Sequence, residues 1–245
     1  MTAVRSTALQ PSARSMLYDD VLAALQTVRD PELDEPLTDL GFVSECTVTA
    51  EGDVTVRLRL PTYFCAPNFV FLMVADAYDA VAGVPGVHRV RILLDDHFAS
   101  DQINDGVAAR AGFRDTFAGF AEDELDELRH DFLRKAVLAG TDRVCRPLLA
   151  GRSPGQLAAL QLGDAADTPE RERLRARRVE LGLPAGDDDP LLMDVGTGRG
   201  VGVEALPVHL ARARLTRVSL DANAGVCRGM LHDRYTTIGV GEKEE

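Results

Sequence analysis

The sequence is poor in lysine and in positive charge, which narrows the range of partners. Lys135 and Lys243 are the only lysines, and the net charge is −12. Residues 1–115 hold 17 acidic residues against 9 arginines, and the remainder holds 22 against 18 basic residues, so neither half is basic. A surface of this charge repels nucleic acid and anionic lipid. We therefore expect neither a nucleic acid nor a membrane as a partner.

Long apolar segments and paired cysteines are also missing. The longest apolar run, Phe69–Ala75, is far too short to cross a bilayer. The first 15 residues are polar and lack the apolar centre of a secretory signal. The four cysteines show no C-x-x-C spacing: Cys46, Cys65, Cys145 and Cys227. A disulfide framework is not expected in a chain of this size, so we predict a cytoplasmic protein.

The first half has the pattern of a small α+β domain. Apolar residues make up 45% of the chain, which is enough for a packed core. Residues 54–60 alternate apolar and polar side chains, as a half-buried strand does. The predicted order is α-β-β-α-β with a three-stranded sheet, over residues 15–29, 42–49, 54–60, 67–82 and 87–94.

The second half is predicted to be mostly helical. The expected helices cover residues 121–139, 142–149, 154–162 and 208–214, with a further one starting at Thr168-Pro169. A glycine-rich β-hairpin is expected over 191–203 and a strand over 216–220. The chain is thus predicted to have a flexible tail (1–14), an α+β domain (15–117) and a mainly helical extension (118–245).

Cys65 stands where the alternating strand gives way to the apolar helix. Pro67 suits the first turn of that helix, because its φ is already fixed near the helical value. The start of a helix carries unpaired backbone N–H groups and the positive end of the dipole. Both favour a thiolate, which is the form of cysteine that binds metals. The alternative is that Cys65 is a small buried residue of the loop.

Three stretches in order resemble one known family. They are Val-Arg-Asp-Pro-Glu-Leu at 28–33, Thr-Asp-Leu-Gly-Phe-Val at 38–43, and the loop Pro-Thr-Tyr-Phe-Cys-Ala-Pro at 61–67. With Val-Pro-Gly-Val at 84–87, they make residues 18–98 similar to the PaaD/SufT-like family of iron–sulfur cluster assembly proteins. The chain departs from the family pattern at Ala66, which separates the cysteine from the proline.

The resemblance implies a non-catalytic accessory factor for the assembly of iron–sulfur clusters or other metal centres. Its partners would be cluster-assembly proteins or a client metalloenzyme, such as a multicomponent oxygenase. Its cargo would be iron or an iron–sulfur cluster, bound transiently. The family's cysteine corresponds to Cys65, and its acidic loop residues correspond to Asp30, Glu32 and Asp39.

Each of these residues can also have a purely structural role instead of binding a metal. Asp30 and Asp39 can cap neighbouring backbone groups instead of binding metal. His97, after the last strand, is either a metal or partner contact or a solvated histidine. A cluster needs about four protein ligands, so Cys65 alone fits only a transient ligand or one that bridges a homodimer. Cys227 and His232 lie five residues apart and do not share a helix face well, so no second metal site is predicted there.

Two other functions compete with this reading. One is a cofactor-free adaptor that holds a client with residues 118–245. The other is an S-adenosylmethionine-dependent methyltransferase, suggested by the glycine-rich segment 193–200 and by Asp221 after the strand expected at 217–220. Only 45 residues follow Gly200, too few for a doubly wound nucleotide-binding domain. A simple glycine hairpin is therefore the favoured reading of this segment.

Overall fold

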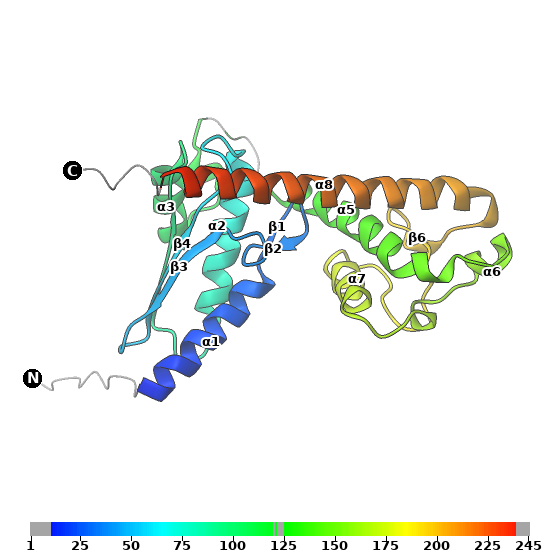
Figure 1. Ribbon diagram of the computed structural model, residues 1–245, viewed down its shortest axis with the longest axis horizontal. Helices are drawn as coiled ribbons and strands as arrows, with labels where there is room; N and C mark the ends of the chain where they lie inside the picture. The colour runs from blue at the N-terminus through cyan, green and yellow to red at the C-terminus, as the bar shows by residue number, and fades with distance from the viewer. Residues whose placement is uncertain (1–10, 120, 122–124, 239–245) are drawn as a thin grey trace, which may run out of the picture. The chain divides into compact units, whose positions relative to one another are not determined.

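The computed structural model describes residues 11–119, 121 and 125–238 (Figure 1). The chain forms two compact units, each described by itself. The first unit consists of Met1–Leu125 together with Ala224–Glu245, and the second of Asp126–Asn223. None of the helices in the described ranges combines the length and apolar character that a membrane span requires.

A three-stranded sheet forms the centre of the first unit (Figure 1). β3 (Val43–Val48) pairs antiparallel with β4 (Asp53–Leu58), and β4 pairs parallel with β5 (Arg89–Leu94). The parallel pair requires a crossover, which α2 (Pro67–Ala82) supplies. This arrangement confirms the predicted α+β class and the α-β-β-α-β order.

The core of the first unit lies between this sheet and two helices. Along β4, Val54, Val56 and Leu58 are buried on one face, as the alternating sequence predicts. They pack in one cluster with apolar residues of α1 (Pro11–Thr27) and α2. Besides the end of the C-terminal helix, described below, the unit has four short elements: β1 (Arg29–Asp30), β2 (Glu35–Pro36), α3 (Ser100–Ala108) and α4 (Phe113–Thr116).

The first helix begins earlier than the sequence predicts. α1 starts at Pro11 and not at Ser15, so residues 11–14 belong to a helix and not to the expected tail. Proline is well tolerated in the first turn of a helix, where its missing N–H costs nothing. The rest of the predicted tail, residues 1–10, lies outside the described residues.

The second unit is mainly helical, as predicted, but two expected helices are one. α5 (Asp126–Cys145) runs through the break expected before residue 142 and is followed by a 3₁₀ turn at Arg146–Leu148. The glycine-rich hairpin is confirmed as β6 (Met193–Asp194) and β7 (Arg199–Gly200). The other helices are α6 (Pro154–Ala158) and α7 (Pro169–Glu180), which Thr168 caps as predicted, with 3₁₀ turns at Leu162–Asp164 and Val203–Ala205.

The strand predicted at 216–220 is wrong. Those residues lie inside α8 (Leu206–Ile238), a single helix of 33 residues. Arg217 in the supposed strand binds Asp221 one turn later and Asp142 of α5, at 2.6 and 2.5 Å. Such i,i+4 and interhelical ion pairs stabilise a helix where the sequence pattern favours a strand. From Ala224 onward α8 belongs to the first unit, and the predicted boundary near residue 117 precedes Leu125.

Candidate functional site

Cys65 lies in the short loop that joins β4 to α2. The backbone of Ala66 is extended and Pro67 opens the helix, as the sequence predicts. Cys65 is partly exposed, so the alternative that it is a small buried residue of the loop is wrong. Its Sγ lies 3.3 Å from the hydroxyl of Thr62, which also accepts a hydrogen bond from the N–H of Phe64. The polar contact of the thiol is therefore a loop hydroxyl.

His97 fixes the backbone of the cysteine loop. It is 3% exposed, so the solvated histidine of the sequence analysis is wrong. Its Nδ1 accepts the N–H of Ala99 at 3.2 Å, and its Nε2 therefore donates to the carbonyl of Cys65 at 2.7 Å. Burial lowers the pKa of His97, although the bond to Cys65 acts in the opposite direction and Arg234 adds to the lowering. With both nitrogens engaged, His97 is a positioning residue and not a free metal ligand.

An exposed aromatic cluster borders the cysteine. Tyr63 and Phe64 precede Cys65 in the loop, and Phe98 follows His97. The centroid of the Phe64 ring lies 5.0 Å from that of Tyr63 and 6.1 Å from that of Phe98. Phe64 is 77% exposed and the other two about half. Large exposed apolar side chains that gather in one place are typical of protein interaction surfaces.

Asp30 shapes the acidic loop that precedes the sheet. Its Oδ1 accepts hydrogen bonds from the N–H groups of Glu32 and Leu33, which confirms the capping reading. Burial raises the pKa of Asp30 to about 6, and the charges of Glu32 and Glu35 add to the rise, while the two backbone bonds lower it. Glu32 itself is exposed. Asp30 is therefore a buried carboxyl group that is costly to ionise.

Asp39 lines a shallow groove of the first unit. Its carboxylate accepts a hydrogen bond from the side chain of Gln26 at 2.8 Å, and among the described residues no backbone N–H is bonded to it. The groove is lined by the 38–41 loop, by Arg59 after β4 and by α8: Thr38, Asp39, Leu40, Gly41, Arg59, Arg228, Leu231, His232, Tyr235 and Thr236. Gly41 has φ +76°, and the position of a Cβ on it would lie 3.3 Å from Leu231. Glycine is required here both by its backbone angle and by the close approach of α8.

The end of α8 also bonds the segments that precede Cys65 and His97 in the chain, which the local sequence does not indicate. Arg234 donates to the carbonyl of Leu60 at 3.0 Å and to that of Asp96 at 2.7 Å. Cys227 lies on the same helix, partly buried against the core of the first unit. Burial, followed by the charges of Asp30, Cys65 and Glu32, raises the pKa of Cys227 to about 11. Cys227 is therefore a partly buried thiol that is costly to ionise.

The predicted metal-site residues are thus only partly brought together. Within the described ranges, no three side chains of His, Cys, Asp or Glu are arranged so as to hold a metal ion. Asp30 and Glu32 lie in one loop, and their charges help to raise the pKa of Cys227. His97 bonds the backbone carbonyl of Cys65. Asp39 lines the groove together with Arg59 and Arg228. The contact of Cys227 with the core of the first unit depends on the register of α8, which sequence periodicity alone does not give.

The glycine-rich segment of the second unit forms hydrogen bonds within itself. The Asp194 carboxylate accepts the N–H groups of Gly196 and Thr197 and the hydroxyl of Thr197, at 2.9 to 3.1 Å. Those N–H groups are the ones that a nucleotide ligand would need in a glycine-rich loop. The acid expected after a strand, Asp221, lies inside α8 instead. Both findings favour the simple hairpin over the methyltransferase reading.

Comparisons with known proteins agree with the first unit. The sequence model of a family described as iron–sulfur cluster assembly protein matches residues 18–93. An uncharacterised protein of Methanocaldococcus jannaschii is 32% identical over 87 residues, which are 36% of this chain and 90% of that protein. A protein of Porphyromonas gingivalis named Fe-S protein maturation auxiliary factor is 30% identical over 96 residues, which are 39% of this chain and 90% of that protein. No solved structure gives a significant match. On this similarity, the chain belongs to the family of iron–sulfur cluster assembly proteins.

Proposed function

We propose that the protein is a non-catalytic maturation factor that passes iron or an iron–sulfur cluster to a client metalloenzyme. The cargo is held transiently through Cys65, and the client docks beside it. The observation that carries this proposal is the partly exposed Cys65 thiol in a loop whose flanking aromatic side chains are exposed. The name of the Porphyromonas gingivalis relative supports the accessory role.

The loop geometry suits a transient ligand. A thiol that takes part in transfer has to be reachable, and Cys65 is neither sealed in the core nor paired in a disulfide. Its carbonyl is held by His97, so the thiol is presented from a defined backbone position. A single protein thiolate leaves most positions of an iron atom open to ligands of a client. The same openness makes Cys65 unsuited to permanent storage of a cluster.

The aromatic cluster supports a protein client. Tyr63, Phe64 and Phe98 are large side chains in one cluster, and aromatic residues are enriched in the cores of protein interfaces. Their position around Cys65 would bring a docked surface next to the thiol. A cofactor-free adaptor would use the same cluster but would not need the thiol, so the two functions differ in what Cys65 does.

A complementation experiment distinguishes the maturation factor from the cofactor-free adaptor. The gene would be deleted in its host, and the activity and iron content of iron–sulfur enzymes would be measured in extracts after reintroduction of wild type, Cys65→Ser or Cys46→Ser. We expect Cys65→Ser to behave like the deletion, while Cys46→Ser, at a partly buried position of β3, behaves like wild type. Full activity with Cys65→Ser would favour the adaptor and contradict the maturation role.

A further inference from the structure

Arg59 is a partly buried arginine of the first unit that has no carboxylate partner among the described residues. It follows β4 directly, and its backbone N–H donates to the carbonyl of Phe42 at 2.8 Å, so the backbone position is fixed. The Nε atom is buried, and no acceptor for its N–H exists in the described part of the chain. A buried polar group that lacks a hydrogen bond is costly, so the fold alone does not explain this side chain.

Arg57, two residues earlier, shows how an arginine of β4 is satisfied within the fold. Its Nε and Nη2 donate to the two carboxylate oxygens of Asp95, at 3.0 and 2.8 Å. The guanidinium thus binds a carboxylate in the bidentate geometry that arginine favours. Arg59 carries the same planar set of donors, but within the described ranges no acidic side chain lies beside it.

Arg59 lines the groove between the 38–41 loop and the end of α8. The groove has a volume of about 360 Å³, which is within the range of sites for small molecules. The Cζ atom of Arg59 lies over the ring of Tyr235, 4.8 Å from its centroid. This cation–π contact holds the side chain in place but supplies no oxygen acceptor for its N–H groups. The guanidinium is therefore positioned in the wall of the groove and can still accept an anionic partner.

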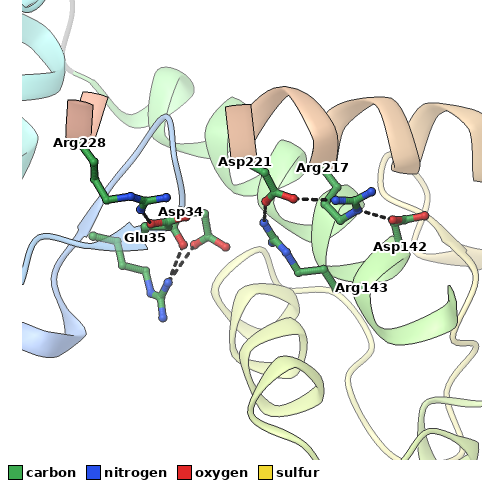
Figure 2. A network of polar contacts seen from close by, with 8 residues as sticks. Asp34, Glu35, Asp142, Arg143, Arg217, Asp221 and Arg228 are labelled. Atoms are coloured by element: carbon green, nitrogen blue, oxygen red, sulfur yellow. Dashed lines mark hydrogen bonds and ion pairs between the residues drawn. The ribbon is translucent and has the colours of Figure 1, made fainter. Parts of the chain in front are cut away.

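The charged residues of the groove favour an anion. Two arginines line it, Arg59 and Arg228, against the single carboxylate of Asp39. Asp39 is bonded to Gln26, and Arg228 forms an ion pair with Glu35 of β2 (Figure 2), so each has a partner that does not line the groove. The chain has 39 acidic residues against 27 basic ones, so a shortage of carboxylates does not explain why Arg59 has none.

We propose that this groove binds a small oxyanion ligand, a molecule that presents a carboxylate or a phosphate group to the guanidinium of Arg59. Both groups offer two oxygens that match the donor fork of arginine. The hydroxyls of Thr38 and Thr236 line the same groove, and the exposed His232 adds a further donor. The site goes beyond the maturation role and does not depend on it, because neither Cys65 nor the aromatic cluster lines this groove.

An NMR titration of the reduced full-length protein tests the site. Amide resonances of isotope-labelled protein would be followed while phosphate or succinate is added at constant ionic strength, so that general screening does not change. We expect saturable shifts with at least one of the two anions, largest at the amides of Leu40, Gly41, Arg59 and Tyr235. Saturation with phosphate alone would identify a phosphate-bearing ligand, and saturation with succinate alone a carboxylate. Saturation with neither anion, or shifts centred outside the groove, would overturn the proposal.

Substitutions test whether the guanidinium of Arg59 makes the contact. Arg59→Gln should weaken binding by at least about tenfold, as the loss of a hydrogen bond to a charged group does. Arg59→Lys keeps the charge but loses the planar fork, so its affinity should lie between those of wild type and Arg59→Gln.

Arg91→Gln is the matched control, because it removes one positive charge at an exposed position of β5 outside the groove. It should bind the anion like wild type. Wild-type affinity in Arg59→Gln would overturn the proposal, and so would equal weakening in Arg59→Gln and Arg91→Gln, which would show only an effect of net charge. The wild-type titration locates the site without any variant, so the proposal can fail even if Arg59→Gln does not fold.

Discussion

His97 donates a hydrogen bond from Nε2 to the carbonyl oxygen of Cys65 across 2.7 Å, although 32 residues separate them in the chain. Its other ring nitrogen accepts the N–H of Ala99, so the imidazole links the loop after β5 to the loop before α2. Asp96, the preceding residue, has φ 49°, a backbone angle that is uncommon for a residue other than glycine. Local strain of this kind is found where a loop has to hold a functional group in place.

Removal of this donor should loosen the cysteine loop. In His97→Leu, the Cys65 carbonyl loses its partner, so we expect the free energy of unfolding to fall by about 1–3 kcal/mol. The thiol of Cys65 should be alkylated by iodoacetamide several times faster than in wild type, as read by mass spectrometry of its peptide. His130→Gln, at an exposed position of the second unit, serves as the control and should change neither quantity. Unchanged alkylation in a folded His97→Leu protein would show that His97 does not position the loop.

The raised pKa of Asp30 predicts that the free energy of unfolding decreases as the pH rises. Because its pKa in the folded protein is raised to about 6 from 3.8, the folded state favours the neutral acid. The stability from this group is full below pH 3.8 and is lost as pH rises through 6. The variant Asp30→Asn keeps an oxygen that accepts the hydrogen bonds from the N–H groups of Glu32 and Leu33. Because the amide does not ionise, the loss of stability with rising pH should be absent in this variant.

The measurement is the difference in unfolding free energy between Asp30→Asn and wild type, by urea titration at several pH values. A shift of about two units corresponds to about 3 kcal/mol, so the difference should move in favour of the variant by up to that amount between pH 4 and pH 7. His97, whose lowered pKa makes stability fall as pH decreases below 6.5, contributes equally to both proteins and cancels. A difference that is constant with pH would show that Asp30 ionises normally.

Much of the first unit could be predicted from the sequence because its signals are local. The helix expected at 67–82 is α2 with the same bounds, since Pro67 opens it and Gly83 ends it. The three strands of the sheet lie where the alternating pattern places them. The place of Cys65 between β4 and α2 and the capping role of Asp30 were also predictable, because both depend on residues within a few positions in the chain.

What could not be predicted depends on contacts that are distant in sequence. Residues 216–220 alternate like a strand, but Arg217 bonds Asp142, 75 residues away, and the helix continues. His97 was expected in solvent because nothing near it in the chain shows that the Cys65 loop covers it. The packing of Cys227 against the core of the first unit was not predictable for the same reason, since it depends on the path of α8.

The ion pairs between α5 and α8 in the second unit should be strongly coupled in their effect on stability (Figure 2). Arg217 of α8 binds Asp142, which is 4% exposed, and also Asp221, which Arg143 of α5 binds in turn. In Arg217→Met the buried Asp142 carboxylate loses its partner, so we expect the free energy of unfolding to fall by about 3–5 kcal/mol.

A double-mutant cycle checks this coupling by urea unfolding. Asp142→Asn in the Arg217→Met background removes the unpaired charge and should recover most of the loss. Arg212→Met, at an exposed position of the same helix, should stay within about 0.5 kcal/mol of wild type. Additive effects of the two substitutions would show that Arg217 and Asp142 do not stabilise the unit as a pair.

The aromatic cluster around Cys65 should matter for function and not for stability. Phe64 is 77% exposed, so Phe64→Ser removes little buried surface, and its free energy of unfolding should stay within about 0.5 kcal/mol of wild type. The same variant should lower iron–sulfur enzyme activity in the complemented deletion strain, because it removes a central apolar contact for the client. Val179→Ser, at a position of the second unit that is 64% exposed, is the matched control and should complement fully. Wild-type activity with Phe64→Ser would place client docking elsewhere on the molecule, whereas a large loss of stability would show that Phe64 supports the fold of the loop.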